Sequence, residues 1–160
     1  MDFSEFVSSG PGIEHSHALE NSINRLLLKE VCRDLFRIRA NSCAPDESYI
    51  RAGIEWISSA QDATGDGGVA RHYSLVAGWG SSYPETTGYI IPTMLNYARR
   101  YSDSTTWDRA LQMADWLTHM QLPCGGIQSG TVGERNMVPS VFNTGQVIFG
   151  WASAFEATGK

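Results

Sequence analysis

One pattern occurs twice in this chain, and it constrains the fold more than any other feature. Each copy contains a Trp and a Gln separated by four residues, then a glycine pair, then a Thr-Gly step that opens an apolar segment. The two sets are Trp56, Gln61, Gly67-Gly68 and Thr87-Gly88, and Trp116, Gln121, Gly125-Gly126 and Thr144-Gly145. Each unit predicts a helix, a polar glycine-rich loop and a second helix, and a repeat of about 60 residues is typical of stacked supersecondary units.

Apolar residues recur at helical spacing in five segments, and no segment predicts a strand. The segments lie at about 17–40, 47–60, 84–100, 106–120 and 140–157, after a lead-in over residues 1–16. Pro84 favours a helix start, Pro92 predicts a kink or a local break, and Thr158-Gly159 ends the last helix. Trp56 and Trp116 lie on helix faces that we expect to be buried. The sequence therefore predicts one all-α domain over residues 17–160.

The connections between these helices alternate in length. Residues 61–83 and 121–139 are long and rich in glycine, whereas the connections after 17–40 and 84–100 are short. In an up-and-down array of helices, alternate connections lie at the same end. We therefore expect both long loops to line one rim, and long loops in compact domains are commonly functional.

Composition excludes several classes of function. The 160 residues are 42 % hydrophobic and 18 % charged, which is typical of a soluble globular protein. A net charge of −5 without a basic cluster argues against nucleic acid binding, and no apolar run is long enough for a membrane span. Cys32, Cys43 and Cys124 lack metal-ligand spacing. We expect reduced thiols, a cytoplasmic location, and neither metal nor cofactor.

The motifs resemble those of the α/α-toroid superfamily, also described as six-hairpin or terpenoid-cyclase-like. The stretch Ser82 to Thr93 is similar to the C-terminal domain of glucuronyl C5-epimerase-like proteins, and Asn143-Thr144-Gly145-Gln146 is similar to a recurrent toroid repeat. The resemblance covers about 47–160 and implies a carbohydrate-active protein, although toroids host several reactions. A closed toroid has five to seven helix pairs, so the resemblance implies an incomplete or open toroid. Either the chain is a fragment of a larger toroid, or self-association covers an exposed apolar edge.

Four residues of the first copy are candidates for catalysis: Asp66, Tyr73, Tyr83 and Glu85. Carboxylates and tyrosines transfer protons in general acid–base catalysis. Each also has a structural interpretation, since Glu85 in a first helical turn complements the helix dipole and Asp66-Gly67 is a common turn pair. Together with Asp66, the neighbouring Asp62 is a candidate carboxylate pair for glycosidic bond cleavage.

Five further residues are candidates for substrate binding: Arg71, Trp79, Tyr89, Asn143 and Gln146. An Arg suits a substrate carboxylate, and an aromatic ring suits a sugar face. Helix N-termini at Thr87 and Asn143 would favour an anion such as a uronate. The structural alternatives are an Arg–carboxylate pair for Arg71, a loop plug for Trp79 and ordinary N-capping for Asn143.

These residues predict a protein that acts on or binds an acidic poly- or oligosaccharide, of epimerase, lyase or hydrolase type. The chemistry would be proton abstraction next to a uronate carboxylate, with Arg71 holding that carboxylate. Two alternatives remain open. One is a non-catalytic helical-repeat binding module, and the other is an inactive fragment of a larger toroid enzyme.

Overall fold

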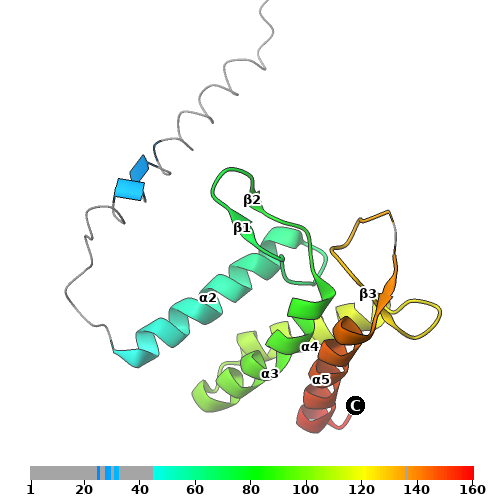
Figure 1. The fold of residues 1–160 in the computed structure, drawn as a ribbon. Helices are drawn as coiled ribbons and strands as arrows, with labels where there is room; N and C mark the ends of the chain where they lie inside the picture. Colours follow the sequence, from blue (N-terminus) through cyan, green and yellow to red (C-terminus); the bar gives the residue numbers. More distant parts are fainter. Residues whose placement is uncertain (1–24, 26–27, 30, 33–44, 136) are drawn as a thin grey trace, which may run out of the picture. The chain divides into compact units, whose positions relative to one another are not determined.

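The computed structural model describes residues 25, 28, 29, 31, 32, 45–135 and 137–160 (Figure 1). The chain divides into two compact units, Met1–Cys43 and Ala44–Lys160. In the first unit the described residues are helical, in agreement with the helix predicted there. The rest of that helix and the lead-in over 1–16 lie outside the described residues.

Four helices make up the second unit, and each lies close to its predicted segment. They are α2 (Asp46–Thr64), α3 (Pro84–Tyr101), α4 (Ser104–His119) and α5 (Val141–Thr158). Asp103 caps α4 by accepting a 3.0 Å hydrogen bond from the Thr106 N–H, and Gly159 ends α5 in the left-handed conformation. Pro92 lies inside α3, which continues through it as one helix.

The prediction that the chain contains no strand was wrong, because both long loops fold into β-hairpins. Strand β1 (Tyr73–Ser74) pairs with β2 (Gly78–Trp79), and β3 (Ile127–Gln128) pairs with β4 (Pro139–Ser140). In the first turn, the Ser74 hydroxyl accepts hydrogen bonds from the N–H groups of Val76 and Ala77. Runs of two residues are too short to show the alternation that marks a strand in sequence.

Helices α3 and α5 approach each other at two glycines. A Cβ atom on Gly150 would lie 2.5 Å from the Gly88 carbonyl oxygen, and one on Gly88 would lie 2.8 Å from the Gln146 oxygen. Only glycine allows backbones to come this close. Around this contact lie fully buried side chains of α3, α4 and α5, among them Ile91, Leu117 and Val147.

The repeated Thr has the same role in both copies. The Val69 N–H donates a 2.9 Å hydrogen bond to the Thr87 hydroxyl, and the Ile127 N–H donates one of the same length to Thr144. Each hydroxyl also lies within 2.8 Å of the carbonyl four residues earlier in the chain. The Thr-Gly step thus ties the segment that follows the glycine pair to the first turn of the next helix.

The two repeated tryptophans differ in environment. Trp116 is buried against the first glycine pair, where a Cβ on Gly68 would lie 2.6 Å from its ring. Trp56 is 55 % exposed, so the prediction that it is buried was wrong. Its ring contacts Tyr73 and Trp79 of the first hairpin, which cover one part of it and leave the rest in solvent.

Candidate functional site

Both hairpins lie at one end of the second unit, beside the N-termini of α3 and α5 (Figure 1). The second loop contacts the first through the Val132 N–H, which donates a 2.9 Å hydrogen bond to the Ser82 carbonyl. The alternating lengths of the connections predict this arrangement. The end of the unit that carries the hairpins is called the rim below.

The first hairpin gathers four candidate residues on one face. Tyr73 pairs with Trp79, and the ladder continues through Ala70 and Ser82 toward α3. Because alternate residues of a strand share a face, Arg71 and Tyr83 lie on the same side as Tyr73 and Trp79. The candidates were predicted from residue type alone, and the hairpin register explains why they come together.

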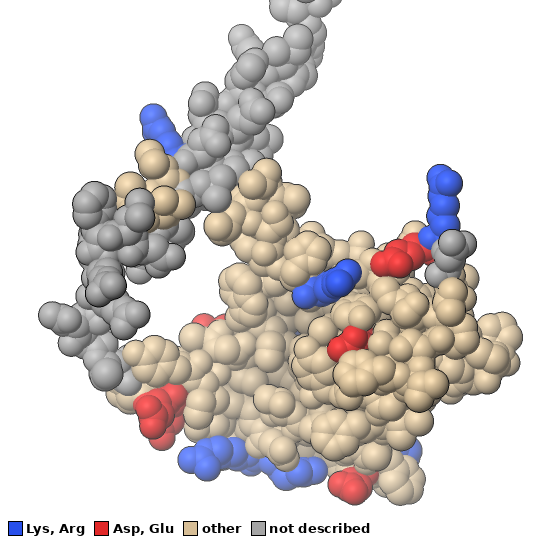
Figure 2. Space-filling view, in the orientation of Figure 1, with Lys and Arg blue, Asp and Glu red and all other residues tan. Residues whose placement is uncertain are grey.

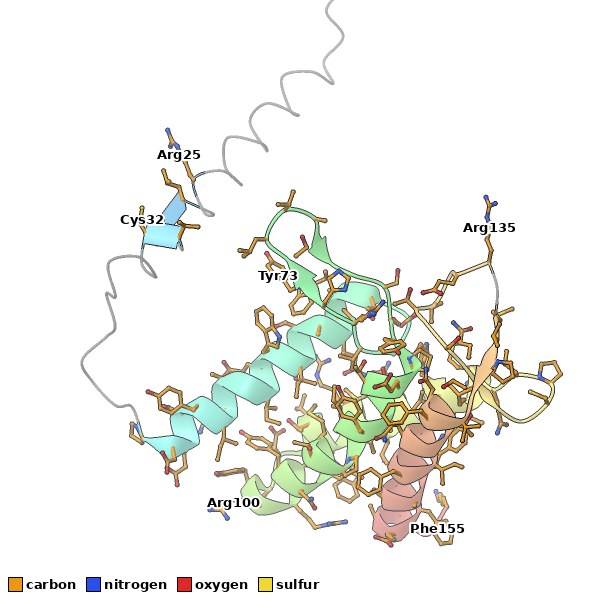
Figure 3. All side chains as sticks on the ribbon, viewed as in Figure 1. Arg25, Cys32, Tyr73, Arg100, Arg135 and Phe155 are labelled. Carbon is orange, nitrogen blue, oxygen red and sulfur yellow. The ribbon has the colours of Figure 1, made fainter. Side chains whose placement is uncertain are left out.

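Three aromatic rings pack against each other at this face. The Tyr73 and Trp79 ring centroids lie 4.9 Å apart, and those of Trp56 and Trp79 lie 4.7 Å apart. Tyr73 remains 46 % exposed and is labelled on the hairpin in Figure 3. The cluster of Trp56, Tyr73 and Trp79, called the aromatic cluster below, therefore offers ring surface to a ligand while its rings hold each other in place.

Arg71 is exposed and has no carboxylate partner among the described residues. Its guanidinium carbon lies 5.2 Å from the centroid of the Tyr83 ring. The nearby Glu134 carboxylate is engaged elsewhere, by the N–H and hydroxyl of Thr131 at 2.8 and 2.9 Å, and these hydrogen bonds lower the pKa of Glu134. In Figure 2, blue (basic) and red (acidic) side chains lie near one another in the upper part of the view.

Arg109 is an arginine with a structural role in the same chain. Its two terminal nitrogens donate to the two carboxylate oxygens of Asp62 at 2.8 and 3.0 Å. The bidentate pair joins α4 to α2 and gives the candidate carboxylate Asp62 a structural role. The structural alternative for Arg71, an Arg–carboxylate pair, thus describes Arg109.

Tyr83 and Glu85 form a short hydrogen bond at the start of α3. The Tyr83 hydroxyl donates to Glu85 Oε2 at 2.6 Å. This hydrogen bond is the main cause that raises the pKa of Tyr83, and burial adds to the shift. A phenol with a raised pKa keeps its proton at neutral pH. Tyr83 is thus the hydrogen-bond donor of the pair, and Glu85 is the acceptor.

Replacing Glu85 by Gln is expected to lower the Tyr83 pKa, because the carboxylate that favours the protonated phenol is lost. The measurement is the alkaline titration of the Tyr83 ring by NMR with labelled tyrosine. Since the folded-state pKa is raised, the hydrogen bond contributes stability below a pH of about 10 and loses it as the pH rises through the folded pKa. Glu134→Gln is the control, and an equal shift in that variant would contradict the assignment.

The remaining candidates are placed as follows. Asp66 Oδ1 accepts hydrogen bonds from the Gly68 N–H at 2.9 Å and from the Ser82 hydroxyl at 2.7 Å. The Asn143 side chain is buried and donates to the Gln128 carbonyl at 2.9 Å. Tyr89 is exposed on α3, and Gln146 is half-buried on α5. Asp66 and Asn143 therefore hold the two loops, while the structure brings Arg71, Tyr83 and Glu85 together and packs Tyr73 against Trp79.

Two hollows lie beside this cluster, and Arg71 and Glu85 line neither. The first, of about 310 Å³, is lined by Ala63, Thr64, Asp66, Trp79, Gly80, Ser81, Ser82 and Val132. The second, of about 540 Å³, is lined by Asp66, Gly67, Gln112, Asp115, Trp116, His119, Met120 and Val132. Arg71, the candidate for a charged ligand, is itself exposed, and Glu85 is half-buried.

Sequence reasoning missed the part that Trp56 plays at the site. Its helical spacing indicates a core position, yet its ring supports Tyr73 and Trp79 from α2. The two repeated tryptophans share the same local pattern, so spacing alone does not separate the exposed Trp56 from the buried Trp116.

Comparisons of the chain with protein-family models, characterised proteins and solved structures found no match. Among the described residues, no group of three or more His, Cys, Asp and Glu side chains is placed to hold a metal ion. Within the same residues, no helix has the length and apolar character needed to cross a membrane.

Proposed function

We propose that this chain binds an acidic oligo- or polysaccharide at the rim, through Arg71 and the aromatic cluster. The observation that carries the proposal is the exposed Arg71 guanidinium, which lies over the half-buried Tyr83 ring and has no acidic partner in the described part of the chain. An exposed Arg of this kind can bind a substrate carboxylate by donating two parallel hydrogen bonds to it. Tyr73 offers a ring face for the sugar attached to that carboxylate.

The rim also supplies hydrogen-bond donors whose partial charge is positive, the sign that attracts an anion. The first turn of α3 begins beside Tyr83, and free N–H groups at a helix N-terminus favour an anion. Arg71 and Tyr73 are both exposed, which suits a ligand that extends beyond one sugar unit. The repeat of two helical hairpins supports placing the chain in the α/α-toroid class, with α3 and α5 as one layer and α2 and α4 as the other.

Replacing Arg71 by Gln is expected to weaken binding of a uronate oligosaccharide about tenfold or more, since a charge-assisted pair is worth about 1.5 to 3 kcal/mol. The measurement is calorimetric titration with an oligouronate and with a neutral oligosaccharide of equal length. The control is Arg100→Gln. It removes the same charge from an Arg that also lies over an aromatic ring, at the other end of α3 (Figure 3). Equal losses in both variants, or equal affinity for the neutral sugar, would overturn the proposal.

A second candidate function is proton transfer at the sugar, as in an epimerase or lyase. The Tyr83–Glu85 hydrogen bond of 2.6 Å favours it, because it joins a proton donor to a proton acceptor next to Arg71. The titrated samples separate the two functions when they are incubated in heavy water. Deuterium incorporation into the uronate, or its cleavage, supports catalysis, whereas an unchanged ligand supports binding alone.

A further inference from the structure

Helix α5 carries apolar side chains on a face that no other described element covers. Between Val141 and Thr158 its one charged residue is Glu156. One side of the helix packs on α3 through Val147, Gly150 and Ala154. The opposite side exposes seven uncharged residues, Val141, Phe142, Gly145, Ile148, Phe149, Ala152 and Phe155, together with Glu156. The seven uncharged residues are called the α5 outer face below.

The size of the α5 outer face is that of an interface. At about 200 Å² for a whole Phe side chain, the exposed fractions of Phe142, Phe149 and Phe155, 60 %, 55 % and 60 %, leave roughly 350 Å² open to solvent. Val141 and Ile148 are 93 % and 54 % exposed and enlarge the area. The total approaches the roughly 800 Å² that each partner buries in a standard interface. Phe155 points away from the helix in Figure 3.

The order of residues on this face identifies its partner. Six residues of this face are symmetric about the centre of α5: Ile148 and Phe149 lie at the centre, Gly145 and Ala152 lie three residues further out, and Phe142 and Phe155 follow after three more. Beyond them the symmetry ends, because the counterpart of Val141 is Glu156. A helix with this symmetry is complementary to an antiparallel copy of itself. In such a pair, each Phe at the ends meets a Phe, and each small residue meets a small residue.

Small residues determine how closely the two copies can approach. Gly145 and Ala152 are seven residues apart, so they lie on the same stripe of the helix. No other described atom lies within 4 Å of the position of a Cβ on Gly145. A two-fold axis places the small pair of one copy against that of the other, so the backbones can come close and the flanking Phe rings can interleave.

A head-to-tail arrangement fits less well. It would place α3 of a second copy on the α5 outer face in the way that α5 packs on α3 within one chain. At the position equivalent to Gly150, α3 has Thr93, whose side chain cannot enter a contact where a Cβ would lie 2.5 Å from a carbonyl oxygen. The two-fold arrangement needs the α5 outer face alone.

We propose that the α5 outer face is a homodimer interface, in which α5 packs antiparallel to α5 of a second copy about a two-fold axis between Ile148 and Phe149. Closed two-fold dimers use one self-complementary surface on both subunits. The antiparallel order places the N-terminus of one α5 beside the C-terminus of the other. The two rims then open on opposite sides of the dimer, and each keeps its access to ligand.

The test measures the mass of the full chain by sedimentation under reducing conditions, because Cys124 is exposed. Wild type is expected to have twice the mass of one chain. Ile148→Lys and Phe149→Glu, tested separately, are each expected to weaken the dimer more than tenfold. Leu75→Glu changes an equally exposed residue of the first hairpin and is expected to leave the mass unchanged. Circular dichroism checks that each variant keeps its helices.

A mixture of the two charged variants tests the two-fold geometry. When an Ile148→Lys chain meets a Phe149→Glu chain, the introduced lysine of one faces the introduced glutamate of the other, and the second contact keeps its native pair of Phe149 and Ile148. Equimolar mixing is therefore expected to restore the dimer. A monomeric wild type overturns the proposal. A higher oligomer, or a mixture that stays monomeric, overturns it as well.

Discussion

Replacing Gly150 by Ala is expected to lower the free energy of unfolding by about 1 to 3 kcal/mol, a large effect for one methyl group. The added Cβ would lie 2.5 Å from the Gly88 carbonyl oxygen and 3.0 Å from the Ile91 side chain. The first of these atoms belongs to the backbone of α3, so relief requires the two helices to move apart. Urea unfolding followed by circular dichroism measures the change.

The control for this prediction is Gly53→Ala in α2. Gly53 is exposed inside a helix, and no described atom lies within 4 Å of the position of its Cβ. Alanine there is expected to raise the free energy of unfolding by about 0.5 to 1 kcal/mol, through helix propensity alone. If Gly150→Ala also stabilises the protein, the close contact between α3 and α5 is not present in solution.

The sequence predicts the helices well because their signals are local. Apolar spacing, the Asp103 cap and the Gly159 stop each act within a few residues, and each helix boundary falls within a few positions of its prediction. The rim follows from the same reasoning, since alternating loop lengths place alternate connections at one end. Pro84 opens α3 as expected of a Pro at the first helical position.

The hairpins depend on contacts between residues far apart in the chain, so the sequence did not predict them. The same contacts decide whether a candidate side chain faces the site or is hydrogen-bonded within a loop. Nothing in residues 61–83 indicates that Arg71 and Tyr83 would share a face, because the ladder that places them has strands of two residues. The same holds for Asp66, whose carboxylate is engaged by Ser82 from the other end of the loop. Residue type identified the candidates, and the register of the hairpin separated those at the site from those that hold the loop.

The repeat itself explains why the two tryptophans differ. A repeat unit buries its Trp against the glycine pair of the unit before it, as Trp116 does against Gly67 and Gly68. Trp56 lies in the first unit, so the described chain offers it no preceding glycine pair, and the first hairpin takes that place. The same sequence motif therefore has a packing role in one copy, and in the other it supports the rings of the proposed ligand site.

Replacing Trp116 by Ala is expected to lower the free energy of unfolding by about 3 to 5 kcal/mol, the usual cost of deleting a buried aromatic ring. Trp116 is 6 % exposed, and its ring fills the space beside Gly67 and Gly68. Trp56→Ala is the matched variant and is expected to cost about 1 kcal/mol, since its ring is half in solvent and loses two ring contacts. Both values come from urea unfolding followed by circular dichroism, because fluorescence changes with either deletion.

In ligand binding the order of the two variants is expected to reverse, with the larger loss of affinity in Trp56→Ala. Trp56→Ala removes the support of Tyr73 and Trp79, so it is expected to weaken uronate binding while the fold persists. The ring contacts of the aromatic cluster do not involve Trp116, so binding by the folded fraction of Trp116→Ala should stay near wild type. Equal losses of stability in the two variants would mean that the copies are equivalent in energy. In that case the exposure of Trp56 would not mark the site.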